Sequence, residues 1–440
     1  MRFLNRSQFF AWDRCLQLLN YYSWGLIAPF VACYRQVTRS RQRLVLITGS
    51  VGKTTTTRAT SALLLGHTPA WIHEGDNCFG AAGWNLIRQG ARTPCVPLEI
   101  GIGTPGQMDR YAWVFRPDMV IMTAIASDHV RRFHRGGKEL WQEKAVIVRA
   151  LRRDGLAILN GDDPVVMRMA TLTKARVVTF GLSPDCDFRA EQLEIRPTGT
   201  RFLLCAQGMS VEVHSQLVGR DAVRSLVAAV AAGRALGTSL ELLRTKLESL
   251  SPTPGRMQPI RLSSGATAIC DDFKAGFETV QSALRTLAEM KAPRKIVVLG
   301  SLYRPQWPRG DKYTQLGMQV AAFADRIVLV GKRARLYRRG FTNLPPGVQV
   351  DEVQTIDEAV TLLRSELQAQ DVVLIKGRGE EKLARIALEL SGAQVHCKIA
   401  FCKLENILCQ VCPYLSQSYV SARGKGASHE PGFVATSSGS

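Results

Sequence analysis

The sequence predicts an α/β fold made of two consecutive domains, each built on a mainly parallel sheet. Short apolar runs of strand length alternate with helix-length segments along most of the chain, a pattern typical of parallel sheets covered by helices. A cluster of helix and strand breakers at 251–255 interrupts this alternation. At 440 residues, of which 46% are hydrophobic, the chain is too long for one core and apolar enough for two.

The first large domain is predicted from residue 44 to residue 254. A helix-length segment at 139–152 lies between two of its strands, and an Ala-rich helix is predicted over 222–236. Residues 187–213 form short alternating segments that predict a small antiparallel side sheet. The parallel strands are predicted at 44–48, 95–100, 119–123 and 156–160.

The second domain is predicted over 255–395, as a smaller Rossmann-like α/β domain with strands at 268–270, 296–299, 327–330 and 372–375. Residues 396–440 are expected to form a Cys-containing extension that ends in a disordered tail, because the end of the chain is rich in Ser and Gly. The cysteines of the extension indicate either a metal site or free buried thiols. They are Cys397, Cys402, Cys409 and Cys412, of which only the last two have ordinary metal-ligand spacing.

Residues 1–43 form an amino-terminal segment that is apolar in its middle and carries arginines on both sides. Its apolar stretch at 16–31 is interrupted by polar residues and is marginal as a spanning helix. The pattern suits an amphipathic segment on an anionic membrane, with an ordinary packing helix as the alternative. No secretory leader precedes the eleven cysteines, so we expect reduced thiols and a cytoplasmic protein, with the inner face of the plasma membrane as its contact.

The net charge of +20 favours anionic ligands without choosing among them. No zinc-finger spacing or aromatic ribonucleoprotein motif is present, so nucleic acid is not expected as a partner.

A glycine-rich loop follows the first predicted strand and opens a helix. In this context backbone N–H groups and the helix dipole bind phosphate, the lysine neutralises its charge and the next threonine ligates Mg²⁺. The general phosphate-loop pattern would place its first glycine at Ile47, so that part of the pattern is not met. We therefore predict a phosphate-loop ATPase domain that binds ATP and Mg²⁺ through Gly49, Ser50, Val51, Gly52, Lys53, Thr54 and Thr55.

The Gly-Lys-Thr-Thr sequence and the motifs after it resemble the Mur ligase family of ATP-dependent amide ligases, over roughly residues 44–390. The resemblance implies that Glu99, in Leu-Glu-Ile-Gly, joins Thr54 around Mg²⁺. It also implies that His129, in Ser-Asp-His, helps to hold a second metal. Lys144, in Glu-Lys-Ala, resembles the family lysine that is carbamylated to become an anionic metal ligand. Without the resemblance, Lys144 would be interpreted as a solvated helix lysine.

In the second domain the resemblance implies that Arg256 reaches the ATP phosphates and that Asp271 lies near the ribose. The strand ends at 299–301 and 376–379 are similar to those of the D-alanyl-D-alanine-adding member of the family. Two family motifs are altered, at 221–222 and 273–277, which affects the contacts to adenine and to the amino acid. The loop begins near residue 49, so the separate domain that binds the UDP-sugar is not expected here.

The resemblance implies a ligase of peptidoglycan biosynthesis that joins a carboxylate to an amino acid or small peptide through an acyl phosphate. Lys53, His129, Lys144 and Arg256 are its implied catalytic residues. Three alternatives stay open: a nucleotide-binding scaffold or regulatory pseudo-ligase, a poly-γ-glutamate synthetase-like polymer ligase, and a phosphate-loop kinase. The two small-molecule substrates and the oligomeric state are left open.

Overall fold

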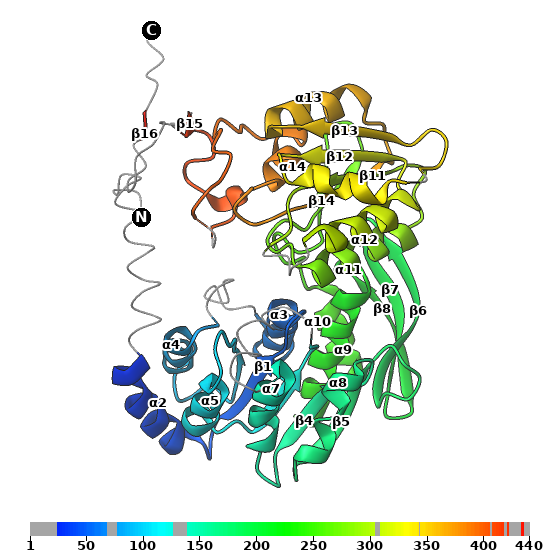
Figure 1. Cartoon of the computed structure of the whole chain (residues 1–440). Helices are drawn as coiled ribbons and strands as arrows, with labels where there is room; N and C mark the ends of the chain where they lie inside the picture. The colour runs from blue at the N-terminus through cyan, green and yellow to red at the C-terminus, as the bar shows by residue number, and fades with distance from the viewer. Residues whose placement is uncertain are drawn as a thin grey trace. The chain divides into compact units, whose positions relative to one another are not determined.

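The computed structural model describes residues 24–67, 77–125, 139–303, 309–342, 344–404, 407–417, 420–421 and 433–434. These fall into two compact units. Unit 1 comprises residues up to 194 together with 199–251, and unit 2 comprises 195–198 and the residues from 252 onward. The predicted α/β class is confirmed in both units, each of which has a largely parallel sheet (Figure 1).

Unit 1 is built on an eight-stranded sheet with the order β2-β1-β3-β4-β5-β6-β7-β8. Strands β1 to β5 are parallel to their neighbours, as short buried apolar runs joined by helices should be. The strands are β1 (Arg43–Thr48), β2 (Cys95–Glu99), β3 (Met119–Met122), β4 (Leu156–Asn160), β5 (Arg176–Gly181), β6 (Phe188–Arg196), β7 (Gly199–Ala206) and β8 (Met209–Ser215).

Helices cover both faces of this sheet. Alternate residues of β1 enter different cores: Val45 and Ile47 lie in one hydrophobic cluster, Leu44 and Leu46 in the other. The first cluster includes residues of α3 (Lys53–Leu65), α9 (Arg220–Ala235) and α10 (Leu240–Glu248). The second includes residues of α2 (Trp24–Thr38), α4 (Phe79–Gln89), α5 (Gln107–Phe115), α7 (Leu140–Arg149) and α8 (Pro164–Met167), and packs against η1 (Ala170–Leu172).

The small antiparallel sheet expected at 187–213 is present as a hairpin but is not separate. Strands β7 and β8 pair antiparallel and extend the central sheet at one edge. Their inward side chains, such as Phe202, Leu204 and Val213, belong to the same core as β1. The hairpin therefore completes the sheet, because its apolar face needs the α9 and α10 side chains for burial.

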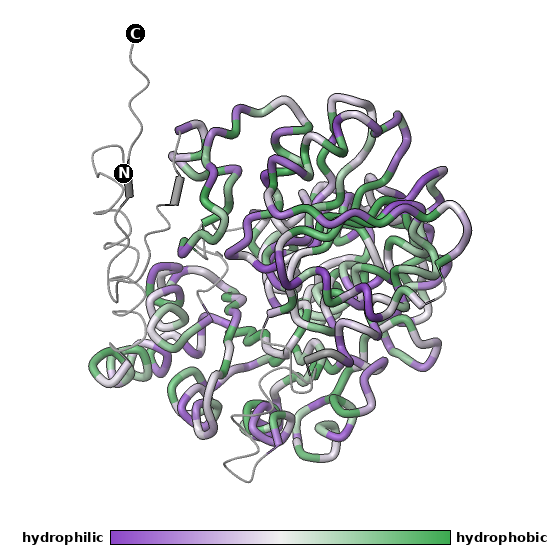
Figure 2. Tube along the Cα trace, turned by 45° about the horizontal axis from the view of Figure 1, so that its top comes forward, coloured by the Kyte–Doolittle hydropathy of each residue, from purple (hydrophilic) through white to green (hydrophobic). Residues whose placement is uncertain are grey.

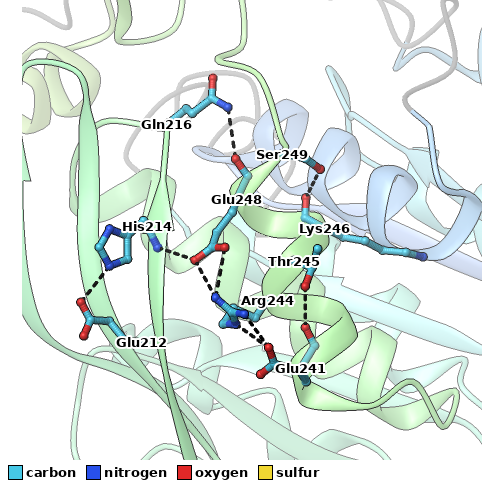
Figure 3. A network of polar contacts seen from close by, with 9 residues as sticks. All are labelled: Glu212, His214, Gln216, Glu241, Arg244, Thr245, Lys246, Glu248 and Ser249. Carbon is cyan, nitrogen blue, oxygen red and sulfur yellow. Dashed lines mark hydrogen bonds and ion pairs between the residues drawn. The ribbon is translucent and has the colours of Figure 1, made fainter.

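A polar network fixes this hairpin to α10 (Figure 3). Arg244 bonds to both Glu241 and Glu248, and Glu248 accepts a hydrogen bond from the backbone N–H of His214. On the same helix, Lys246 donates a 2.6 Å bond to the carbonyl oxygen of Leu63, at the end of α3. A cation at a helix carboxyl end also complements the helix dipole, so the helix that leaves the glycine loop is held at its far end.

Unit 2 contains a six-stranded sheet with the order β13-β12-β11-β14-β10-β9, in which only β9 is antiparallel to its neighbour. The strands are β9 (Gln258–Arg261), β10 (Thr267–Cys270), β11 (Lys295–Leu299), β12 (Arg326–Val330), β13 (Gln349–Val353) and β14 (Val372–Lys376). The helices are α11 (Phe277–Glu289), α12 (Arg309–Ala321), α13 (Ile356–Glu366) and α14 (Ala384–Leu390), with η2 (Ala334–Gly340) and η3 (Cys409–Val411).

Hydrophobic stretches run through the interior of each unit (Figure 2). The described part of the tail predicted to be disordered is limited to its first residues and to β15 (Val420–Ser421) and β16 (Phe433–Val434), which pair with each other. Within the described ranges no helix has the length and apolar character needed to cross a membrane.

Candidate active site

The glycine loop lies between the end of β1 and the start of α3. Gly52 takes the helix N-cap position with φ +85°, and no side chain caps the helix there. The N-cap glycine thus offers no side-chain acceptor to the N–H groups of the first turn, an arrangement suited to binding phosphate at a helix amino end. The hydroxyl oxygen of Ser50 is buried without a hydrogen-bond partner among the described residues. Such an orphaned polar atom fits a loop whose ligand is an oxyanion.

Gly49 is required by the tight packing of this loop on the segment after β3. Its φ is +146°, and a Cβ placed there would lie 2.0 Å from Thr123 Oγ1. The Thr123 hydroxyl also lies 2.6 Å from the carbonyl oxygen of Val51, and the Ser50 N–H donates a 2.6 Å bond to the carbonyl of Ala124. The segment after β3 thus stabilises the conformation of the loop.

The cationic and hydroxyl side chains of the loop diverge. Lys53 folds over the loop, with Nζ 3.5 Å from the carbonyl oxygen of Ser50. Thr54 points toward β2, and its hydroxyl donates a 2.9 Å hydrogen bond to Glu99 Oε2. Asn77 donates a 3.0 Å bond to the other carboxylate oxygen. The predicted metal ligands Thr54 and Glu99 therefore meet, with Asn77 orienting the carboxylate.

Asn77 is a site residue that the sequence prediction missed. Its backbone carbonyl accepts hydrogen bonds from the Gly101 N–H, at 2.8 Å, and from the Tyr111 hydroxyl, at 2.8 Å. A Cβ at position 101 would lie 2.8 Å from the Asn77 carboxamide. The Leu-Glu-Ile-Gly sequence thus has a physical reason for its glycine, since the residue two positions after Glu99 must leave room for Asn77.

Lys144 is buried, with 4% of its surface exposed, and is not the solvated helix lysine of the alternative interpretation. Its Nζ donates a 2.6 Å hydrogen bond to the carbonyl oxygen of Gly49. The helix α7 that carries it begins with a capping box between Glu139 and Gln142. The adjacent Glu143 is fully buried and accepts a 2.9 Å bond from the N–H of Met108, which fixes α7 against α5.

His129 lies outside the described residues. The segment that leads to it is fixed up to Ile125, whose N–H donates a 2.8 Å bond to Asp163. Asn160 donates a 2.6 Å bond to the carbonyl oxygen of Thr123. Asp163 also caps α8, so the Asn-Gly-Asp-Asp sequence after β4 has an architectural role beside the loop.

In unit 2 the predicted residues Arg256 and Asp271 lie at the start of the domain and at the end of β10. The Arg256 guanidinium lies over the Phe273 ring, 4.8 Å from its centroid. Asp271 accepts a 2.6 Å ion-pair bond from Lys376, a fully buried residue at the end of β14. Burial lowers the pKa of Lys376, and the Asp271 charge opposes that shift. The carboxyl ends of β10 and β14 therefore carry charged side chains, at the place where α/β proteins usually bind ligands.

A second carboxylate in unit 2 connects the segments that follow β11 and β14. Glu381 accepts hydrogen bonds from the N–H groups of Ser301 and Arg378, each at 3.0 Å, and from the Ser301 hydroxyl. Burial raises the pKa of Glu381. The Arg378 guanidinium lies 5.5 Å from the Tyr303 ring centroid and 5.2 Å from that of Phe401.

The Cys-containing extension is fixed to the rest of unit 2 by two buried cations, a feature that the sequence prediction missed. Lys382 donates to the carbonyl oxygens of Leu404 and Ile407, at 2.7 and 2.8 Å. Arg385 donates to those of Cys397 and Ile399, both at 2.6 Å. Among the described residues, no three His, Cys, Asp or Glu side chains gather as metal ligands, and the described cysteines of the extension are free thiols.

A small cavity lies where the extension meets the start of unit 2. Asp272 lines it and is buried; one of its carboxylate oxygens accepts a 2.8 Å bond from the Ala384 N–H, and the other has no hydrogen-bond partner within the part of the chain that the structure describes. Burial raises the pKa of Asp272, and burial likewise raises the pKa of the Cys409 thiol to about 12. The full lining is Gly255, Asp272, Phe273, Gly379, Lys382, Ala384, Leu408, Cys409 and Gln410.

Comparison with known proteins links these features to one family. The Mur ligase middle domain matches residues 47–233, and the Mur ligase glutamate ligase domain matches residues 255–379. The diaminopimelate-adding UDP-N-acetylmuramoyl-L-alanyl-D-glutamate ligase of Geobacillus thermodenitrificans is 29% identical over 281 residues, which are 60% of this chain and 56% of that protein. The UDP-N-acetylmuramoyl-tripeptide–D-alanyl-D-alanine ligase of Escherichia coli is 28% identical over 298 residues, 66% of this chain and 65% of that protein.

Solved structures show the same fold. MurF from Acinetobacter baumannii superposes with a TM-score of 0.72 at 23% identity, covering 83% of this chain and 80% of that one. MurF from Thermotoga maritima, solved in complex with ADP, superposes with a TM-score of 0.67 at 19% identity, covering 82% of this chain and 83% of that one. With two Mur ligase domains matched in order and the loop, carboxylate and lysine gathered in the first of them, the chain belongs to the Mur ligase family.

Proposed function

We propose that this protein is an ATP-dependent ligase that forms an amide bond between a carboxylate substrate and an amino acid or small peptide. The observation that carries the proposal is the 2.9 Å contact between Thr54, in the glycine loop, and the Glu99 carboxylate at the end of the neighbouring strand. A hydroxyl and a carboxylate beside a phosphate-binding loop form an oxygen donor set for Mg²⁺. Family membership supports the same reading.

The proposed reaction transfers the γ-phosphoryl group of ATP to the substrate carboxylate, and the amine then displaces phosphate from the acyl phosphate. Such a reaction depends mainly on positioning and charge neutralisation. The loop of Gly49 to Thr55 would bind the phosphates, with Lys53 neutralising their charge. Thr54 and Glu99 would hold Mg²⁺, which polarises the transferred phosphoryl group when bound.

Lys144 and His129 are proposed as ligands of a second metal, with Lys144 carbamylated. The burial of Lys144 against the Gly49 carbonyl supports this assignment, because carbamylation requires an amine that is neutral part of the time and burial favours the neutral form. Arg256 and Asp271 remain proposed nucleotide contacts in unit 2. The carbamate would keep an N–H for the Gly49 carbonyl while placing its negative charge beyond it.

The substrates are proposed by class. The relatives are named for ligases that act on UDP-N-acetylmuramoyl peptides. The chain spans less than two thirds of the length of each of those two relatives. We therefore propose a cell-wall carboxylate with a D-alanyl-D-alanine-like or dicarboxylic amine. The place of action is proposed to be the cytoplasm, at the inner face of the plasma membrane through residues 1–43.

The deciding experiment is ADP release by the purified chain against a panel of carboxylates, namely UDP-N-acetylmuramoyl peptides and glutamate oligomers. Each is offered with D-alanyl-D-alanine, diaminopimelate or glutamate. We expect amine-dependent release that Lys53→Ala abolishes and that Lys174→Ala, at an exposed lysine of unit 1, leaves unchanged. Hydroxylamine added in place of the amine should trap the acyl phosphate as a hydroxamate.

Two results would contradict the ligase, and a third would change its substrate class. ATP binding without turnover on any pair would indicate the nucleotide-binding scaffold. A phosphorylated product that survives hydroxylamine would indicate a kinase. Products of growing length with glutamate alone would indicate the polymer ligase.

A further inference from the structure

Helix α2 (Trp24–Thr38) is an integral part of unit 1, packed beside α4 and α5 on the outer side of the unit (Figure 1). Its inner face is closely packed: Ala28 and Val31 are buried, and a Cβ at Gly83 of α4 would lie 3.0 Å from a Val31 methyl. The Trp24 ring lies 4.1 Å from that of Phe79. These contacts account for one side of the helix only.

Arg35 locks this helix in place. It is fully buried and donates to the carbonyl oxygens of Phe115, Gln42 and Arg116 at 3.0, 2.9 and 3.3 Å. It also forms a 2.6 Å ion pair with Asp118, which accepts a bond from the first residues of β1 as well. A buried guanidinium with this many partners fixes both the position and the rotation of α2. The side of the helix opposite Arg35 is therefore fixed facing away from the rest of unit 1.

That outer face is apolar. Leu26, Phe30 and Val37 are 77%, 73% and 74% exposed, and Cys33 between them is exposed as well. Their spacing of four, three and four residues places them on one stripe of an α-helix. A surface helix normally carries polar residues on this side, so a second apolar stripe, opposite the buried one, indicates a partner. We define the outer stripe as these four residues.

The charges around the outer stripe select the partner. Helix α2 contains no Asp or Glu, and Arg41 and Arg43 beyond its end are exposed. On neighbouring α5, Trp113 is 57% exposed and Arg110 is exposed. Exposed aliphatic and aromatic side chains edged by arginine match an anionic lipid surface, where apolar groups enter the acyl boundary and cations meet headgroups.

We propose that the outer stripe of α2 is a membrane-docking face that binds anionic bilayers without spanning them. It holds unit 1 at the membrane by a fixed helix of the fold. The stripe lies apart from the glycine loop, so this inference does not depend on the proposed reaction.

The test is sedimentation of the full chain with vesicles of phosphatidylcholine alone and of phosphatidylcholine mixed with phosphatidylglycerol. We expect binding to the mixed vesicles that weakens with salt. Leu26→Ser/Phe30→Ser/Val37→Ser should reduce that binding about tenfold or more, because it removes the inserted apolar area. The matched control, Met209→Ser/Leu242→Ser/Met318→Ser, changes three exposed apolar residues elsewhere and should bind as the parent does.

A second readout uses Cys33, which lies within the stripe. Mixed vesicles should slow its alkylation by a water-soluble maleimide, followed by mass spectrometry of the peptide that contains it. The melting temperature and any ATP turnover of the triple variant should match the parent, which separates lost docking from lost folding. The inference is overturned if the triple variant sediments like the parent, or if the stripe instead holds two copies together. Light scattering would reveal the latter as a dimer that the triple variant abolishes.

Discussion

Lys144 Nζ lies 2.6 Å from the carbonyl oxygen of Gly49, so a buried lysine of α7 is hydrogen-bonded to the first residue of the glycine loop. The bond joins two segments 95 residues apart in the sequence. It gives the loop a second cation besides Lys53, whose Nζ lies 3.5 Å from the carbonyl oxygen of Ser50. A lysine in this place acts on the loop whether or not it is modified.

Replacing Lys144 with Met tests this arrangement. The change leaves the Gly49 carbonyl without its donor, and we expect a loss of about 1–3 kcal/mol in unfolding free energy. We also expect ligase turnover to fall by at least about a hundredfold, as for groups that stabilise charge in the reaction. Lys174→Met, at an exposed position, is the control. If Lys144→Met kept both turnover and stability, Lys144 would be a bystander.

Because Asn77 orients the Glu99 carboxylate, we predict that changing Asn77 weakens Mg²⁺ binding more than ATP binding. Asn77→Leu removes the 3.0 Å bond to Glu99 but leaves Thr54 in place. We expect the Mg²⁺ concentration for half-maximal turnover to rise about tenfold to a hundredfold, the usual effect of losing an outer-shell partner. The KM for ATP at saturating Mg²⁺ should change much less. An equal change in both would mean that Asn77 acts through general folding of the loop.

The packing at Gly49 predicts a steric cost for adding a side chain to the glycine loop. Gly49→Ala would bring a methyl group within 2.0 Å of Thr123 Oγ1. Gly66→Ala, at φ +77°, also places an alanine at a positive φ but meets no atom within 4 Å. We expect Gly49→Ala to cost about 1–3 kcal/mol more than Gly66→Ala in unfolding free energy. Urea unfolding of the two variants provides the comparison, and equal losses would refute the steric reading.

The paired aspartates after β10 predict opposite responses to substitution. Burial raises the folded-state pKa of Asp272, so the folded protein binds a proton that the unfolded chain releases at about pH 4. Stability therefore falls as the pH rises from that value through the raised pKa, and then levels off. Relative to the parent, Asp272→Asn should gain melting temperature across this window.

Asp271→Asn should behave in the contrary way, because it leaves buried Lys376 without its carboxylate. At neutral pH we expect a loss of about 3–5 kcal/mol in stability. Melting curves of both variants over a pH series decide the matter. If the melting temperatures of the two variants changed in the same way with pH, the environments of Asp271 and Asp272 would not be distinct.

The sequence predicted the parts of the fold that are strongly apolar. Strand β4 was predicted at its observed bounds, 156–160, because its first four residues are consecutive apolar residues and are all buried. Strand β13 was missed, since its sequence Gln-Val-Asp-Glu-Val is largely polar and it lies at the edge of its sheet. The β7–β8 hairpin was predicted, but its union with the main sheet depends on contacts that no local pattern reports.

The candidate site was predictable where a short motif carries the chemistry, as in the glycine loop. The meeting of Thr54 with Glu99 came from a family resemblance, and the structure places the two side chains together. Asn77 was not predictable, because an isolated asparagine has no distinguishing sequence pattern. The burial of Lys144 was equally hidden, since a helix lysine is ordinarily exposed.

The attachment of residues 396–417 to unit 2 bears on how this chain can diverge. The acceptors that Lys382 and Arg385 engage are the carbonyl oxygens of Cys397, Ile399, Leu404 and Ile407, and every amino acid supplies a main-chain carbonyl. Mutations at those four positions leave the carbonyl acceptors in place, whereas loss of either cation leaves two of these carbonyl oxygens without their donor. Selection on these four hydrogen bonds therefore falls on Lys382 and Arg385, whereas Ile399 and Leu404, which are buried, are constrained by packing and not by their role as acceptors.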